Sequence, residues 1–189
     1  CACQNCHPGR AEDVASSVHG MAFAQGQSPS AVCYKCHSGH QVYQQKGRNR
    51  ATCGGCHEQI EKEYEHSLHG YALGKGIDKA PDCTGCHGDH RILPSTNPES
   101  HIFRRNIGKT CGKCHGEEAV MAEGNIRLPR AAFTYETSVH GLAMSRGLDN
   151  AATCLDCHGD HSLKGAGDAT SRINVNNIST TCGKCHPTI

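Results

Sequence analysis

Seven copies of one five-residue pattern, Cys-x-x-Cys-His, dominate this chain of 189 residues. Covalent attachment of a c-type haem uses this pattern, because the two thiols form thioethers to the porphyrin and the adjacent histidine ligates the iron. The attachment cysteines would be Cys3, Cys6, Cys33, Cys36, Cys53, Cys56, Cys83, Cys86, Cys111, Cys114, Cys154, Cys157, Cys182 and Cys185. The proximal ligands would be His7, His37, His57, His87, His115, His158 and His186. The sequence therefore predicts seven haem c groups.

Zinc is the alternative ligand for paired cysteines. Structural zinc sites are also built from Cys-x-x-Cys pairs, but they do not require a histidine directly after every second cysteine. All seven copies here have that histidine. The regularity favours haem over zinc.

The composition agrees with a fold built around cofactors. Only 36% of the residues are hydrophobic and 4% are aromatic, while 22 are glycine. A chain this polar cannot bury enough apolar surface to offset its conformational entropy. Seven porphyrins would supply that surface. We expect a haem-dominated fold, mostly coil with short α-helices and little or no β-structure, in one domain over residues 1–189. The haem-free chain should be largely unfolded.

A two-haem repeat runs along the chain. Three of the motifs, at Cys33, Cys83 and Cys154, are followed by a further histidine three residues after the proximal one, and we call them decorated. Each is preceded by Ser-x-His-Gly, whose histidine lies 14 residues before the first cysteine. The other four motifs are plain and alternate with the decorated ones. This alternation predicts internal units of about 1–52, 53–110 and 111–189.

Eight histidines lie outside the motifs and are candidates for the distal iron ligands. They are His19, His40, His66, His69, His90, His101, His140 and His161. Six of them recur at fixed positions in the repeat. A histidine three residues after a proximal ligand cannot cross the edge of the same porphyrin. The trailing histidines His40, His90 and His161 must therefore ligate a neighbouring haem.

Constant spacing suggests which haem each histidine serves. The Ser-x-His-Gly histidines keep a fixed distance only to the decorated motif that follows. We therefore assign His19, His69 and His140 to the haems on Cys33/Cys36, Cys83/Cys86 and Cys154/Cys157. The trailing histidines would serve the plain haems that follow, at Cys53, Cys111 and Cys182. For the first haem, on Cys3/Cys6, the ligand could be His66, His101 or a histidine of a neighbouring chain.

Helical signals are short. Glu58–His69 is rich in helix-forming residues and is followed by Gly70, which predicts one helix ending there. Similar helices are expected before His19 and His140, and helical structure is expected to continue into Gly20–Gly26, Gly70–Gly76 and Gly141–Gly147. The third unit also contains an insertion at Gly116–Ala132, expected to be helical at its start and broken at Gly124 and Pro129.

Covalent haem attachment takes place outside the energy-conserving membrane, so we expect an exported protein: periplasmic, cell-surface or extracellular. No run approaches the roughly 20 apolar residues of a membrane span. Cys1 could carry a lipid anchor, stay unmodified, or replace Cys3 as the partner of Cys6. The formal charge is +1 and there is no basic tract, which argues against binding of nucleic acid.

The combination of Ser-x-His-Gly with Cys-x-x-Cys-His-Gly-Asp-His, as at Cys83–His90, resembles the multihaem c-type cytochromes with doubled motifs. These include periplasmic electron carriers and extracellular cytochrome filaments. The resemblance implies low-potential, bis-histidine haems packed in a continuous chain.

The expected function is electron transfer rather than catalysis, with redox partner proteins or extracellular acceptors as partners. The carrier could be a discrete shuttle or a homopolymer with haem contacts between subunits. The alternative is a nitrogen-oxide or hydroxylamine-type enzyme with one open haem, for which the first haem would be the candidate.

Overall fold

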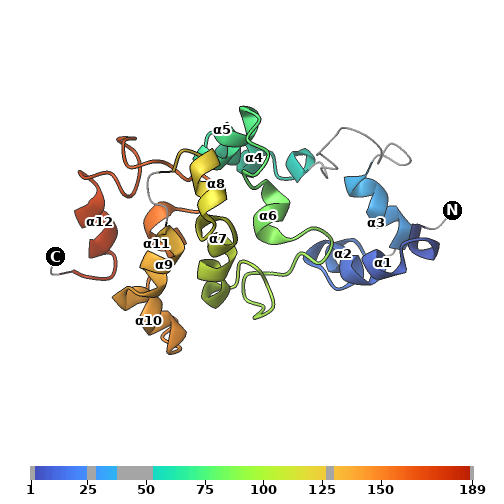
Figure 1. Ribbon diagram of the computed structural model, residues 1–189. Helices are drawn as coiled ribbons and strands as arrows, with labels where there is room; N and C mark the ends of the chain where they lie inside the picture. The colour runs from blue at the N-terminus through green and yellow to red at the C-terminus, as the bar shows by residue number, and fades with distance from the viewer. Residues whose placement is uncertain (1–2, 25–28, 38–52, 127–129, 188–189) are drawn as a thin grey trace.

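The computed structural model describes residues 3–24, 29–37, 53–126 and 130–187. These residues form short helices joined by irregular segments and contain no β-strand, as predicted. The helices are η1 (Cys3–Asn5), α1 (Pro8–Ala15), α2 (Val18–Phe23), α3 (Pro29–Cys36), η3 (Cys53–Gly55), α4 (Glu58–Glu65), α5 (Leu68–Gly74), α6 (Cys83–His87), η4 (Arg104–Asn106), α7 (Ile107–His115), α8 (Glu118–Glu123), α9 (Ala131–Glu136), α10 (Val139–Ser145), α11 (Cys154–His158) and α12 (Ile178–Gly183). The molecule is elongated, with α1–α3 at one end and α12 at the other (Figure 1).

The helix expected over Glu58–His69 is wrong in its boundary. Helix α4 ends at Glu65, and α5 begins at Leu68 and passes through Gly70. The break occurs because Ser67 is the N-cap of α5: its Oγ accepts a hydrogen bond of 3.1 Å from the Gly70 N–H. The histidine of Ser-x-His-Gly therefore lies in the first turn of a new helix.

The same break recurs in the other two units. The caps are Ser17 at the start of α2 and Ser138 at the start of α10, which accept from the N–H groups of Gly20 and Gly141 at 3.0 Å and 3.2 Å. The helices expected before His19 and His140 are present as α1 and α9, but each also ends before the Ser-x-His-Gly. The sequence motif thus encodes a helix–break–helix corner.

The second and third units repeat each other in detail. Tyr64 donates its hydroxyl to the carbonyl of Pro81 at 2.6 Å, and Tyr135 donates to the carbonyl of Ala152 at 3.1 Å. Further equivalent bonds are Ser100 to Leu93 and Ser171 to Lys164, Asn106 to Ser100 and Asn177 to Ser171, and Thr110 to His101 and Thr181 to Arg172. The two units therefore share one backbone course from the Ser-x-His-Gly corner to the next plain motif.

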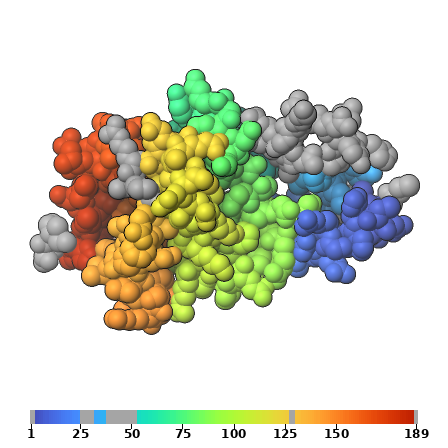
Figure 2. Space-filling model, viewed as in Figure 1, coloured from blue at the N-terminus to red at the C-terminus, as the bar shows by residue number. Residues whose placement is uncertain are grey.

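The polypeptide buries few apolar side chains. Those found in the described residues are Val32, Leu73, Leu93, Ile107, Met121, Met144 and Ala151. Large apolar side chains such as Tyr71 and Phe133 are instead half exposed or more. The space-filling view shows the units lying side by side along the molecule rather than around one centre (Figure 2). Packing of the protein alone thus provides only a small core.

The insertion in the third unit begins as predicted. Helix α8 covers Glu118–Glu123, and Gly124 is its C-terminal cap. Pro129, expected as a second break, lies outside the described residues. No helix in the described part of the chain has the length and apolarity needed to cross a membrane.

Candidate metal centres: facing histidine pairs

The structure brings ten of the fifteen histidines together as five facing pairs. Each pair joins one histidine of a Cys-x-x-Cys-His motif to one histidine from outside the motifs. The ring centroids are 6.0 Å apart in His19–His57, 6.1 Å in His37–His90, 6.0 Å in His69–His115, 5.9 Å in His87–His161 and 6.1 Å in His140–His186.

This spacing fits an iron held between two imidazoles. Metal–nitrogen bonds of about 2 Å on both sides, with each ring nitrogen about 1 Å from its ring centre, would put the two centroids roughly 6 Å apart. In the described part of the chain, no three His, Cys, Asp or Glu side chains gather as a potential ion site. Two facing imidazoles would suit a metal whose other four ligands come from a porphyrin.

The Ser-x-His-Gly histidines face the plain motifs and not the decorated ones. His19, His69 and His140 face His57, His115 and His186, so their assignment to the haems on Cys33, Cys83 and Cys154 is wrong. The constant 14-residue spacing has another cause. In the second and third units, the hydroxyl of Tyr64 or Tyr135 ties the first helix of the corner to the carbonyl just ahead of the decorated motif, which restrains the length of the segment. The first unit has Val14 at this position and lacks this contact.

The trailing histidines face backwards along the chain. His90 faces His37, and His161 faces His87, so each meets the proximal histidine of the preceding decorated motif. This agrees with the inference that a trailing histidine serves a neighbouring motif. The expected partners, the plain haems at Cys111 and Cys182, are wrong. The trailing histidine therefore links two successive units.

An aspartate precedes each of these trailing histidines and holds its backbone. Asp89 Oδ1 accepts from the N–H of His90 at 2.6 Å, and Asp160 accepts from the N–H of His161 at 2.8 Å. This backbone hydrogen bond is the main reason why the pKa of each carboxyl group is lowered. Asp89 Oδ2 also lies 3.3 Å from Nδ1 of His90, which is buried and has no hydrogen-bond partner. Carboxylates near ligating imidazoles commonly orient the ring.

Burial lowers the pKa of several paired imidazoles and so favours their neutral form. It is the main cause of the lowered pKa of His19, His69 and His87, and the facing His57, His115 and His161 lower these values further. A neutral imidazole is the form that ligates a metal. The electrostatics of the pairs therefore favour coordination.

The cysteines of successive motifs lie next to each other. The thiols of Cys53 and Cys83 share a hydrogen bond, which lowers the pKa of Cys53 to about 7 and raises that of Cys83. Equivalent contacts join Cys3 to Cys33 and Cys111 to Cys154, while electrostatic proximity joins Cys36 to Cys56, Cys86 to Cys114 and Cys157 to Cys182. The seven motifs are thus neighbours in space in the order in which they occur in the chain.

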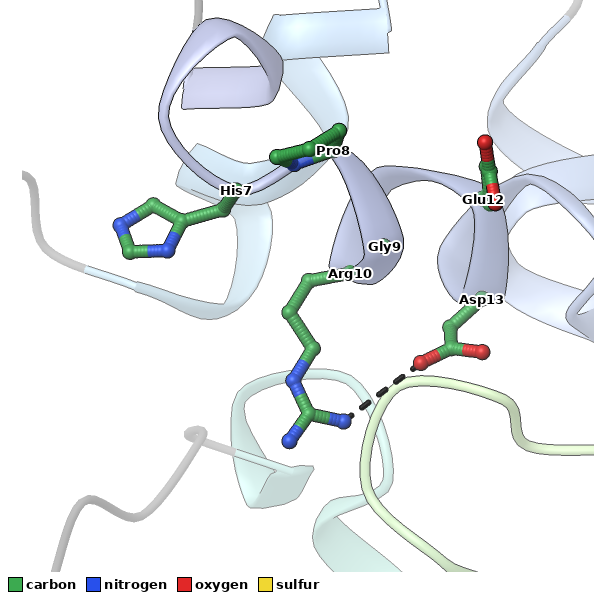
Figure 3. A pocket seen from close by; sticks show the side chains of 6 residues that line it. All are labelled: His7, Pro8, Gly9, Arg10, Glu12 and Asp13. Atoms are coloured by element: carbon green, nitrogen blue, oxygen red, sulfur yellow. Dashed lines mark hydrogen bonds and ion pairs between the residues drawn. The ribbon is translucent and has the colours of Figure 1, made fainter.

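Two proximal histidines, His7 and His158, face no other histidine of the described residues, and both are exposed. The imidazole of His7 stands apart from the neighbouring Arg10–Asp13 ion pair (Figure 3). The two candidates within this chain for the partner of His7, His66 and His101, do not face His7. The exposed ring of His66 donates to the carbonyl of Lys62 at 2.7 Å.

The other candidate, His101, is exposed and lies over Gly88, where a Cβ would be 3.7 Å from its ring. Arg172 takes the same place over Gly159 in the third unit, at 3.8 Å. A position that holds arginine in the equivalent unit points to a role other than iron ligation. His40 and Cys1 lie outside the described residues.

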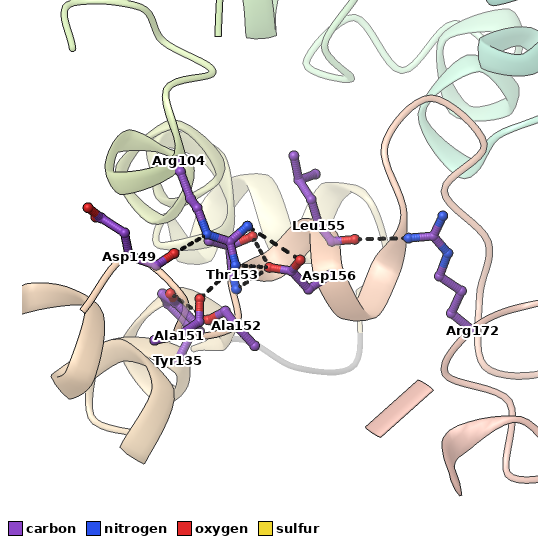
Figure 4. Close-up of polar contacts among 9 residues, drawn as sticks. All are labelled: Arg104, Tyr135, Asp149, Ala151, Ala152, Thr153, Leu155, Asp156 and Arg172. Atoms are coloured by element: carbon purple, nitrogen blue, oxygen red, sulfur yellow. Dashed lines mark hydrogen bonds and ion pairs between the residues drawn. The ribbon is translucent and has the colours of Figure 1, made fainter. Parts of the chain in front are cut away.

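Arg104, which the sequence did not single out, holds the backbone and the helix start at the Cys154 motif. Arg104 donates to the carbonyls of Asp149 and Ala151 at 2.6 Å and 2.8 Å and to the carboxylate of Asp156 at 2.9 Å (Figure 4). Asp156 also accepts from the N–H and hydroxyl of Thr153 at 2.7 Å and 2.8 Å, completing a capping box. The Thr-x-x-Asp spacing in the sequence could have predicted the capping box. No sequence pattern indicates the contact between Asp156 and Arg104, which are 52 residues apart.

Comparisons with known proteins give no relatives. No family model matches the chain, and searches of curated proteins and of solved structures found no match.

Proposed function

We propose that this chain is an electron carrier that holds seven haem c groups on its Cys-x-x-Cys-His motifs. The observation that carries the proposal is the set of five facing histidine pairs, each spaced for one iron. Haem supplies one-electron redox chemistry. The cysteines would hold the porphyrins, and the histidine pairs would occupy both axial positions and thereby exclude substrates from the iron.

The contacts between successive motifs support a linear path. Cys33 lies beside Cys3, and Cys36 of the same motif lies beside Cys56. Each inner motif therefore touches one neighbour through its first cysteine and the other neighbour through its second. Porphyrins attached at these points would form a row in chain order, from the N-terminal to the C-terminal end of the elongated molecule (Figure 1). Electrons would enter and leave at the two ends.

Such a carrier would act outside the energy-conserving membrane, where c-type haem is attached. Its partners would be redox proteins or extracellular acceptors. A discrete periplasmic shuttle and a subunit of a filament use the same row of haems, so the internal electron path does not depend on that choice.

A second candidate function is a nitrogen-oxide or hydroxylamine-type enzyme. The observation that favours it is the pair of exposed histidines, His7 and His158, with no facing histidine in the described ranges. A haem on either motif would have one free axial position in the isolated chain. Binding of nitrite or hydroxylamine to the purified protein, followed by turnover with a reductant, would support the enzyme. Redox cycling without consumption of either compound would support the carrier.

The histidine pairs provide a direct test through His90. Replacing it, His90→Ala, should convert one low-spin haem into a high-spin haem, because His37 loses its facing ring. His101→Ala is the matched control, since this exposed histidine of the same unit faces no other ring in the described residues. Electron paramagnetic resonance and visible absorption of the purified holoprotein measure the change.

The identity of the haem that opens can be established in a second background. In a chain with Cys33→Ala and Cys36→Ala, which lacks that haem, His90→Ala should add no further high-spin signal. If His90→Ala leaves all haems low-spin in the complete chain, or if the added signal persists in this background, the pairing is refuted. A wild-type protein without low-spin haem would overturn the proposed function itself.

A further inference from the structure

Two joints connect the three units, and both use the same pair of contacts. At the first joint, Val18 donates its backbone N–H to the carbonyl of Ile92 at 2.9 Å, and His37 faces His90. At the second joint, Leu68 donates to the carbonyl of Leu163 at 2.9 Å, and His87 faces His161. In each case a His-x-aliphatic segment of the later unit covers the earlier one.

The covered surface has the same two parts in both units. One is the first residue of the helix that carries the Ser-x-His-Gly histidine. The other is the proximal histidine of the decorated motif. Because the segment engages both parts at once, it supplies an imidazole and a carbonyl acceptor from three consecutive residues.

The third unit presents the same two groups without a partner. Val139 begins α10 and is 77% exposed, and no group in the described ranges accepts a hydrogen bond from its N–H. His158, equivalent to His37 and His87, is exposed and faces no ring in the same ranges. This open joint surface is therefore defined by Val139 and His158.

The sequence contains one more segment of the required form. A decorated motif is followed by His-x-aliphatic three times, as His90-Arg91-Ile92, His161-Ser162-Leu163 and His40-Gln41-Val42. The first two fill the internal joints. The third follows α3, and the three residues from His37 to His40 reach about 11 Å at most. Helices α3 and α11 lie far apart along the elongated molecule (Figure 1), so the occupant considered for the surface at His158 is this segment of another molecule.

We propose that the open joint surface of the third unit binds a second copy of this chain through its segment His40-Gln41-Val42. His40 of the incoming copy takes the position opposite His158, and the Val42 carbonyl accepts from the N–H of Val139. The inference rests on the proposed haem at Cys154/Cys157, whose iron the incoming imidazole would complete. Different surfaces meet in this contact, so repetition gives a head-to-tail row of molecules.

The joint between copies differs from the internal joints in one respect. Each internal joint borders one plain motif, whereas this joint borders two, at Cys182 of the receiving chain and at Cys3 of the incoming copy. The joint between copies would therefore contain one plain haem more than an internal joint. The proposal assumes that the contacts of the three-residue segment are the same in this joint as in the internal joints, and it assumes nothing else about the two plain motifs.

The test combines analytical ultracentrifugation with electron paramagnetic resonance on the holoprotein. Wild-type protein should associate with increasing concentration and gain one low-spin haem per chain as it does so. His40→Ala should remain monomeric and keep that haem high-spin. His66→Ala, which removes an exposed histidine without a facing ring in the described residues, should behave as wild type.

A second pair of variants tests the backbone contact. Val139→Pro removes the N–H at the first position of α10, where proline is well tolerated, while Val139→Ala keeps it. Proline should weaken association by about fivefold, the effect of one hydrogen bond, and alanine should have little effect. A synthetic peptide of residues 38–44 should restore the low-spin signal of the His40→Ala protein when added in excess.

The two proposals fail in different ways. Association that is unaffected by both His40→Ala and Val139→Pro would overturn the docking inference, as would a wild-type protein that stays monomeric at every concentration. In either case the five internal pairs would still give low-spin haem. Loss of the low-spin signal from those pairs would instead overturn the proposed function.

Discussion

Gly70 is predicted to be essential for placing His69 opposite His115. A Cβ at this position would lie 2.1 Å from the carbonyl oxygen of Tyr64 and 2.8 Å from the Cα of Glu65. Both are backbone atoms of α4, so no side chain can rotate to make room. Gly70→Ala therefore forces α5 to move relative to α4.

The size of this movement follows from the overlap. Cβ atoms essentially never come within 3.0 Å of another heavy atom, so α5 must shift by about 1 Å. Overpacking of this kind costs about 1–3 kcal/mol, offset in part by about 1 kcal/mol of improved helix propensity. A shift of about 1 Å is also half of a metal–nitrogen bond of about 2 Å. The preceding residue, His69, would lose its place opposite His115.

Gly74→Ala is the matched control because Gly74 lies one turn later in α5. A Cβ there has no heavy atom within 4 Å, so alanine should raise the stability by about 0.5–1 kcal/mol. Thermal unfolding of the holoproteins measures the stability, and electron paramagnetic resonance measures the spin state. Gly70→Ala should lower the midpoint and convert one haem, that on Cys111/Cys114, partly to high spin.

The result that refutes this reasoning is specific. If Gly70→Ala is as stable as Gly74→Ala and all haems keep the wild-type spectrum, the close approach of α5 to α4 does not determine the position of His69. Low stability with an unchanged spectrum would also refute the coupling of the corner to the histidine pair, because the strain would then relax elsewhere.

Two further predictions concern the acid stability of one motif and the role of the cofactors. Burial of Asp156 opposes its ionisation, but hydrogen bonds from Thr153 and Arg104 outweigh burial and lower its pKa below 3.8 in the folded protein. Its stabilising effect is therefore present above pH 4 and is lost as the pH falls through the lowered pKa. The unfolding midpoints of wild type and Asp156→Asn should differ by a constant amount between pH 7 and 5 and converge below pH 4. The haem-free chain should show little helical circular dichroism at 25 °C, whereas a helical spectrum with a cooperative melt would contradict a cofactor-dependent fold.

The short helices and the lack of strands could be predicted because the composition excludes a large apolar core and the glycine-rich segments exclude long helices. A chain with 36% hydrophobic residues cannot form a large core, and its glycine-rich segments limit helix length. The structure has short helices and no strand in its described ranges. The position of each helix end was harder to predict, because Ser67 acts as a cap only through its hydrogen bond to Gly70. Helix propensity alone would continue α4 through that residue.

The sequence could identify the proximal and the distal histidines as two groups, but it could not predict which members of the two groups face each other. Fixed spacing in the sequence correctly separated five repeated histidines from His66 and His101, which face no other ring in the described part of the chain. The sixth, His40, lies outside that part. Spacing did not reveal the partners, since a constant separation can result from any rigid contact. In the second and third units, Tyr64 and Tyr135 restrain the separation through hydrogen bonds to the backbone. The true partners of the Ser-x-His-Gly histidines lie across segments of variable length.

The two kinds of pair have different consequences for how the units depend on each other. A pair such as His140–His186 closes within one unit, whereas His69–His115 and His87–His161 each join two units. With iron in both, as proposed, the first kind would stabilise a unit by itself and the second would make each unit complete only when the next one is in place. Unfolding should then spread across joints rather than stop at them. The open surface at Val139 and His158 follows from the same rule, because the third unit has the part that receives a segment and lacks the segment within the described residues.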